Sequence, residues 1–158
     1  MKPWIAFLGT VALIASVATP GRGSTDPAIG TWSLDVGKSK YEPGPAPKSE
    51  MRTYESMPDG TIRLTIHINM ADGTSVTQTT TYRRDGSPHI ITNNPNIDSI
   101  ETLPGKGGGV RTTYFRAGKV VGHMTTAYSK DRSVLTMTQT LTRPSGQSEH
   151  DVRVYERR

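Results

Sequence analysis

The chain has 158 residues, of which 33% are hydrophobic and 21% are charged; none is cysteine, and the formal charge is +5 at pH 7. The lack of cysteine excludes disulfide support and lipid attachment through a cysteine. Without Lys2 and Arg22, 17 basic residues stand against 14 acidic ones, a surplus of +3 spread along the chain. This spread argues against nucleic-acid binding, which gathers Lys and Arg on one face among aromatic residues.

The first 23 residues have the pattern of a cleaved secretory signal peptide. Lys2 precedes an apolar run at residues 5–17, which is short for a bilayer span, and small residues follow at 16–18. We expect cleavage after Ala18 or near Gly23. The remaining residues, 24–158, are then a single exported domain, periplasmic or secreted, without stable membrane insertion.

Most of the remaining chain alternates between β-branched or apolar residues and polar ones. In residues 61–69, Ile62, Leu64, Ile66 and Ile68 share one face of a strand, whereas a helix would separate them. Similar segments predict strands at residues 30–35, 50–57, 61–69, 74–82, 89–92, 98–103, 110–116, 120–128, 133–142 and 149–156.

Short turns separate these segments. Asp72-Gly73 and Asp85-Gly86 supply residues that adopt positive φ, and such short connections force consecutive strands to run antiparallel. An open sheet of this size would expose two edges. We therefore predict an all-β fold, an antiparallel up-and-down meander barrel of about 8–10 strands, with a β-sandwich as the alternative.

Two segments interrupt the strand pattern. Residues 41–48 contain three prolines, so they cannot pair as a central strand and are expected to cross the barrel end or lie along it. Residues 104–109 (PGKGGG) lack the spacing of a phosphate-binding loop, and we predict a flexible hairpin connection there.

The motif Gly30-Thr31-Trp32 resembles the Gly-x-Trp opening of the lipocalins and fatty-acid-binding proteins, the calycin barrels. The resemblance implies that Trp32 lies at the barrel floor under a late-strand arginine, Arg153 or Arg157, and that Gly30, Trp32 and Arg157 close the barrel. The ending Arg153-Val154-Tyr155 is similar to that of the fatty-acid-binding group, where the arginine and tyrosine grip a carboxylate.

This chain departs from those families between its first two strands, where the proline-rich segment replaces a helical lid. A second resemblance covers Gly30–Leu34, Lys38–Tyr41 and the PGPAPK run at residues 43–48. These residues are similar to the opening of a group of uncharacterised exported bacterial proteins, and that likeness implies no activity.

Polar residues fall on strand faces that could line an interior. Gln78 and Tyr82 share one face, and Gln139 shares another with leucine and methionine. An interior lined by them would hold water or a polar ligand, or they pair across strands near a thin core. Arg153 and Tyr155 lie opposite two valines, and the usual apolar-inward alternation predicts that the valines face the core.

Two functions remain open. The first is an exported lipocalin-like protein that binds a small ligand, anionic or amphipathic, with Arg153, Tyr155, Gln78, Tyr82 and Gln139 as ligand-binding candidates. The second is a non-enzymatic cell-envelope protein with a filled barrel and an unknown protein partner. An enzyme is the least favoured, because no catalytic constellation, cofactor motif or metal-ligand spacing is evident.

Overall fold

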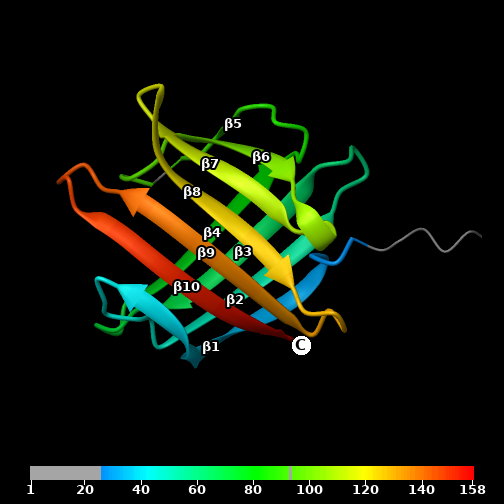
Figure 1. Cartoon of the computed structure of the whole chain (residues 1–158), viewed down its shortest axis with the longest axis horizontal. Helices are drawn as coiled ribbons and strands as arrows, with labels where there is room; N and C mark the ends of the chain where they lie inside the picture. The colour runs from blue at the N-terminus through cyan, green and yellow to red at the C-terminus, as the bar shows by residue number, and fades with distance from the viewer. Residues whose placement is uncertain (1–25, 93) are drawn as a thin grey trace, which may run out of the picture.

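The computed structural model describes residues 26–92 and 94–158, so the predicted leader at residues 1–23 lies outside the described part. This part contains ten strands and one short 3-10 turn (Figure 1). They are β1 (Gly30–Glu42), β2 (Ser49–Ser56), β3 (Ile62–Asn69), β4 (Ser75–Tyr82), β5 (His89–Ile90), β6 (Ser99–Pro104), η1 (Lys106–Gly108), β7 (Val110–Arg116), β8 (Lys119–Tyr128), β9 (Val134–Thr142) and β10 (Ser148–Arg157). The ten predicted strands are confirmed, all but the first within two residues at each end.

The strands form one antiparallel sheet in the order β4-β3-β2-β1-β10-β9-β8-β7-β6-β5. Each strand pairs with its neighbours in the chain except at two places. β1 pairs with β10, which joins the two ends of the chain, whereas β4 and β5 are the unpaired ends of the sheet. The meander barrel is therefore confirmed in place of a sandwich, with closure incomplete between β4 and β5.

The first strand is longer than its predicted span of residues 30–35. A bulge shifts the β1–β10 register between Asp35 and Lys40, and the Ser39 hydroxyl bridges it. This hydroxyl donates to the Asp35 carbonyl at 2.7 Å and accepts from the Val154 amide at 2.9 Å. Pairing then continues to Glu42, so the prediction that all of residues 41–48 lie outside central pairing is wrong for its first two residues. The prolines end the strand after Glu42.

The connection between β6 and β7 carries the glycine-rich residues 104–109. The Gly105 amide donates to the Gly109 carbonyl at 2.8 Å, and η1 lies between them. The predicted hairpin connection is confirmed in position, with a 3-10 turn at its tip.

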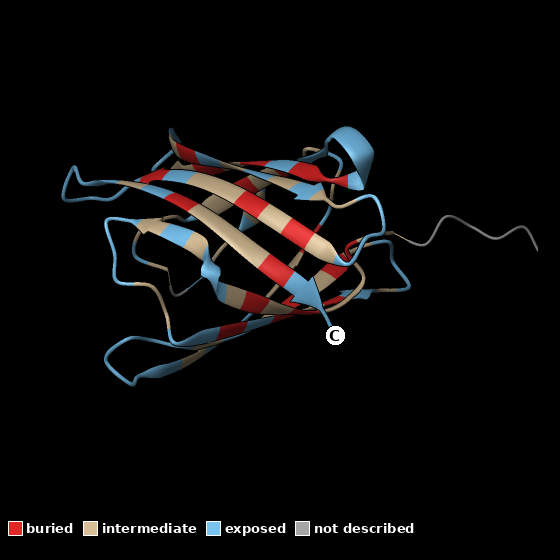
Figure 2. Cartoon of the chain, turned by 60° about the horizontal axis from the view of Figure 1, so that its bottom comes forward, coloured by how far each residue is buried: buried red, intermediate tan, exposed pale blue. Residues whose placement is uncertain are grey.

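Buried and exposed residues alternate along the strands, as the red and pale segments of Figure 2 show. The predicted inner face of β3 is confirmed, because Ile62 and Leu64 are buried and Leu64, Ile66 and Ile68 line the interior. Trp32, Leu135 and Tyr155 have no exposed surface and form the centre of the core.

The floor of the barrel is built where the first and last strands meet. The Arg157 guanidinium carbon lies 4.3 Å from the centre of the Trp32 ring, and the Trp32 indole donates to the Ala28 carbonyl at 2.8 Å. Gly30 has a φ of +127°, and a Cβ there would lie 2.8 Å from the Arg157 side chain. Gly30, Trp32 and Arg157 thus lie together at the seam, as the resemblance implied.

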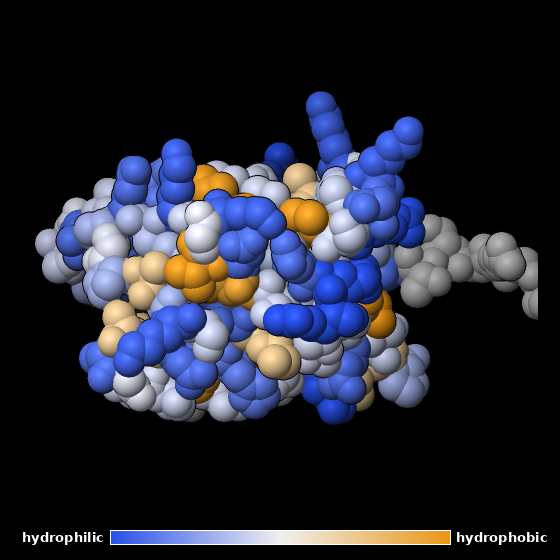
Figure 3. Space-filling model, turned by 90° about the horizontal axis from the view of Figure 1, so that it is seen from below, coloured by the Kyte–Doolittle hydropathy of each residue, from blue (hydrophilic) through white to orange (hydrophobic). Residues whose placement is uncertain are grey.

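The outer surface is mainly hydrophilic on the face seen in Figure 3, with small apolar groups between polar side chains. The exposed large apolar residues come from separate parts of the chain: Val36, Met51, Met70, Ile90, Leu103 and Val120. Within residues 26–92 and 94–158, no helix has the length and apolarity needed to cross a membrane.

Candidate functional site

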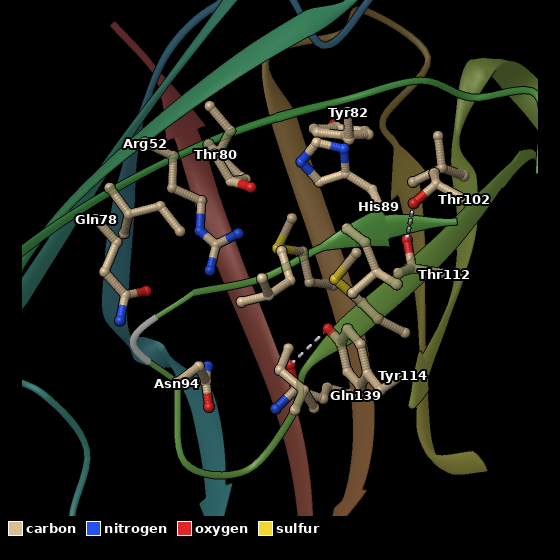
Figure 4. Close-up of a pocket in the computed structure, with 18 of the residues that line it drawn as sticks. Arg52, Gln78, Thr80, Tyr82, His89, Asn94, Thr102, Thr112, Tyr114 and Gln139 are labelled. Carbon is tan, nitrogen blue, oxygen red and sulfur yellow. Dashed lines mark hydrogen bonds between the residues drawn. The ribbon is translucent and has the colours of Figure 1, made fainter. Parts of the chain in front are cut away.

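The barrel is hollow and holds a cavity of about 670 Å³ that is partly open to solvent. Its wall comes from β2, β3, β4 and β6 to β10, and from residues 84–92, which include β5, and 94–97. Figure 4 shows Arg52, Gln78 and Thr80 directed into it from one side and Tyr114 and Gln139 from another. The cavity contradicts the filled interior that the envelope-protein hypothesis assumed.

The wall combines apolar side chains with uncharged polar ones. Its apolar part includes Leu64, Ile66, Met124 and Met137. Its uncharged polar part includes two hydrogen-bonded pairs, drawn as dashed lines in Figure 4: the Tyr114 hydroxyl donates to the Gln139 amide oxygen at 3.0 Å, and the hydroxyls of Thr102 and Thr112 lie 3.0 Å apart. Such a surface suits a molecule with apolar and polar parts.

A buried ion pair within β2 is hydrogen-bonded to the last strand. Arg52 donates from Nε to the Glu50 carboxylate at 2.5 Å, and the Tyr155 hydroxyl donates to the same oxygen at 2.9 Å. The Arg52 guanidinium also lies 5.3 Å from the Tyr155 ring centre. Glu50 is 4% exposed and Arg52 is 7% exposed, so both charges depend on their partners rather than on water.

The pKa of Glu50 follows from opposing effects. Burial alone would raise it, but the charges of Arg52 and Arg153 and the hydrogen bonds from Arg52 and Tyr155 outweigh burial. The pKa of Glu50 therefore lies below its ordinary value, and the carboxyl is ionised at neutral pH.

A second pair lies on β10 itself. Arg153 donates to the Asp151 carboxylate at 2.8 Å, and its guanidinium lies 5.6 Å from the centre of the Tyr41 ring. Asp151 is buried, whereas Arg153 lines the cavity. The Arg153 Nε and the Tyr41 hydroxyl are buried without a hydrogen-bond partner, so this corner retains unused polar capacity.

The tyrosine hydroxyls of the wall are held in their neutral form. Burial raises the pKa of Tyr82 and of Tyr114 to about 12. Both rings line the cavity with a neutral hydroxyl at neutral pH, and that of Tyr114, which donates to Gln139, can still accept a hydrogen bond.

Four of the five candidate residues line one cavity: Gln78, Tyr82, Gln139 and Arg153. Tyr155 faces the same side of β10 but is fully buried behind the wall, where it supports Glu50. The prediction that the valines of β10 face the core, made from the usual apolar-inward alternation, is therefore wrong. Ion pairing within the barrel compensates the inward arginine, so the usual preference for an apolar inner face does not decide the orientation.

The residues that partner the arginines, Glu50 and Asp151, were not among those predicted from the sequence. Two strands carry an acidic residue, an arginine and a tyrosine at alternate positions, Glu50-Arg52-Tyr54 in β2 and Asp151-Arg153-Tyr155 in β10. Alternation puts each set on one strand face, and adjacent opposite charges on a face can neutralise one another. This repeated pattern was the available indication of a charged but compensated inner wall.

The four histidines were predicted to lie on separate strands or strand ends, and His89 lines the cavity. Within the described residues, no group of three or more His, Asp or Glu side chains could hold a metal ion.

The barrel is similar to solved structures with which it shares little sequence. The S-type phycobiliprotein lyase CPES from Guillardia theta matches with a TM-score of 0.57 at 7% identity, over 84% of this chain and 89% of the other. A mutant of the fluorescent protein UnaG matches with a TM-score of 0.53 at 16% identity, over 82% and 94% of the two chains. Zebrafish ileal bile acid-binding protein with cholic acid has a TM-score of 0.49 at 15% identity, over 84% and 99%.

These likenesses concern the fold alone, and the fold is a lipocalin-like, calycin-type β-barrel. No protein-family model and no curated protein sequence matches the chain. One similar structure is named a lyase and another a fluorescent protein, so the shared barrel does not by itself assign an activity.

Proposed function

We propose that this protein binds a small amphipathic molecule inside its barrel. The observation that carries the proposal is the cavity of about 670 Å³, with apolar side chains and converging hydrogen-bonding groups in one wall. Cavities of roughly 300–1,000 Å³ with a few placed polar groups are typical of small-molecule sites. The apolar part of the ligand packs against Leu64, Ile66 and Met124, and its polar end lies toward Arg52 and Arg153.

The ligand enters between β4 and β5. These two strands are the unpaired ends of the sheet, so no backbone hydrogen bonds between them have to break. Between β4 and β6, the cavity is lined by His89, Ile91 and Asn94, among others. A short β5 and its flanking loops are easier to displace than the long paired strands elsewhere in the barrel.

Binding rather than catalysis fits the protonation of the wall. General acid–base catalysis works best with groups whose pKa lies near the working pH. Here the pKa of Glu50 is lowered, and burial raises those of Tyr82 and Tyr114 to about 12. These three groups take part in hydrogen bonds, and their protonation does not change near neutral pH.

The test uses N-phenyl-1-naphthylamine, an uncharged amphipathic dye whose fluorescence rises in apolar surroundings. Met124→Trp fills the cavity from β8, and Thr125→Trp places the same side chain on the outer face of that strand, where Thr125 is exposed. We expect the dye to bind the unmodified protein and Thr125→Trp alike, and to bind Met124→Trp at least about tenfold more weakly.

Equal binding to the folded Met124→Trp variant would place the dye outside the barrel and contradict the proposal. Circular dichroism of both variants controls for folding. Failure of the dye, and of a panel of anionic and uncharged amphiphiles, to bind or to raise the melting temperature would also refute it.

We further propose that the protein acts after export, in the periplasm or outside the cell. The support is the leader-like pattern of residues 1–23. Expression of the whole chain followed by fractionation and N-terminal sequencing tests this. A mature end after Ala18 or near Gly23 in the exported fraction is expected, and a cytoplasmic protein that keeps Met1 would contradict it.

A further inference from the structure

Every arginine in the cavity wall makes an ion pair with a carboxylate of the same chain. The pairs are Arg52–Glu50, Arg84–Asp26, Arg143–Glu149 and Arg153–Asp151. The positive charge that the four guanidinium groups bring to the wall is therefore balanced before any ligand enters. A wall built to attract an anion would leave at least part of this charge uncompensated.

In two of these pairs, Arg52–Glu50 and Arg153–Asp151, the arginine lines the cavity and the carboxylate is buried beside it. Glu50 and Asp151 are 4% and 6% exposed, so water screens their charges poorly. Each lies within 2.8 Å of the arginine that a ligand head group would have to approach. A carboxylate placed there would give up its hydration and meet a second negative charge beside each guanidinium.

An uncharged acceptor meets neither cost. A carbonyl or hydroxyl oxygen is cheaper to desolvate than a carboxylate, and it still accepts a charge-assisted hydrogen bond from a guanidinium. Uncharged partners are also abundant around the same space, and Figure 4 shows Gln78, Thr80 and Gln139 among them.

We propose that the cavity selects an amphipathic ligand with an uncharged polar head, such as an amide or alcohol, over one with a carboxylate. The inference rests on the proposed ligand binding in the barrel. The acidic residue two positions before each arginine, Glu50 in β2 and Asp151 in β10, disfavours a ligand that carries a carboxylate. The wall thereby distinguishes two molecules of nearly the same shape by charge alone.

The experiment compares decanamide with decanoate as competitors of N-phenyl-1-naphthylamine at about pH 7.5, where decanoate is ionised and both are kept below micelle formation. The two compounds share a chain and differ in the charge of the head group. We expect decanamide to displace the dye at least about tenfold more effectively than decanoate.

Removal of one of these two carboxylates should abolish this preference. In Glu50→Gln, decanoate affinity should rise by about tenfold or more while decanamide affinity changes by less than about twofold. Glu55→Gln makes the same change on the outer face of β2, where Glu55 lies 3.7 Å from Arg63, and should alter neither affinity. If Glu50→Gln does not fold by circular dichroism, Asp151→Asn is the second variant, with the same expected gain for decanoate.

The results separate the two proposals. Decanoate that binds as well as decanamide in the unmodified protein, or no gain for decanoate in a folded carboxylate variant, would overturn the selection of an uncharged head and leave barrel binding intact. If the dye does not bind and neither compound raises the melting temperature, the proposed function fails, and this inference fails with it.

Discussion

Two regions of the barrel place an arginine over an aromatic ring, and they use it differently. At the floor, Arg157 lies over Trp32 and donates to the backbone carbonyls of Pro27, Ile29 and Arg132. In the wall, the guanidinium over Tyr155 pairs with the Glu50 carboxylate, and the one over Tyr41 pairs with Asp151.

The difference lies in what the arginine is bonded to. Carbonyls of the segment before β1 and of the turn between β8 and β9 hold Arg157 to the backbone, so these bonds tie the last strand to both places and close the floor. Carboxylates hold the wall arginines, which neutralises charge beside an open cavity and leaves hydrogen-bonding capacity there. The same residue type thus supports closure in one region and ligand selection in the other.

The largest expected effect comes from breaking the floor. Trp32→Ala removes a side chain with no exposed surface, its indole hydrogen bond and the platform beneath Arg157. We expect the free energy of unfolding, measured by urea denaturation, to fall by an amount near the upper end of the range of about 3–5 kcal/mol. A loss below about 1 kcal/mol would show that the floor does not hold the barrel closed.

The second largest effect is expected from the wall, where removal of the Glu50 charge should lower stability in a pH-dependent way. Glu50→Gln leaves Arg52 buried without an anion, although the glutamine oxygen still accepts hydrogen bonds, so we expect a loss toward the lower part of about 3–5 kcal/mol at pH 7. In the folded protein the pKa of Glu50 lies below its ordinary value of 4.5. Its ionised form therefore stabilises the fold above that pH, and this contribution disappears as the pH falls through the folded pKa.

The difference in unfolding free energy between the unmodified protein and Glu50→Gln should thus shrink as the pH falls from about 5 to 3, as seen in denaturation series. Glu55→Gln, on the exposed face of the same strand, is the matched control. A difference that stays constant, or grows in acid, would show that Glu50 is not held ionised by Arg52.

The smallest expected effect separates closure from binding. Arg157→Met keeps an apolar contact with Trp32 but removes the cation and its hydrogen bonds to the backbone, for an expected loss of about 1–2 kcal/mol because the side chain is partly solvated. Binding of N-phenyl-1-naphthylamine should stay within about twofold, because Arg157 does not line the main cavity. Weaker stability with unchanged dye affinity supports the comparison, and a large loss of dye affinity in a folded variant would contradict it.

Local patterns were sufficient for much of the fold. Alternation in β3 predicted which isoleucines and leucine face inward, and the Asp72-Gly73 turn predicted the antiparallel pair of β3 and β4. The same prediction from Asp85-Gly86 is wrong, because this turn lies between β4 and β5, which do not pair. The inward set on β10 was predicted wrongly because both of its faces are of mixed polarity. Its orientation depends on residues of β1 and β2, which lie at the other end of the chain.

By itself, the sequence determined the strands and most of their antiparallel neighbours, because strand alternation and turn chemistry are local properties. Only the tertiary structure decided that the interior is hollow, that β4 and β5 stay apart, and that each arginine of the wall meets a carboxylate. Those outcomes depend on distances between residues as far apart in the chain as Glu50 and Tyr155, which are set by the curvature of the whole sheet.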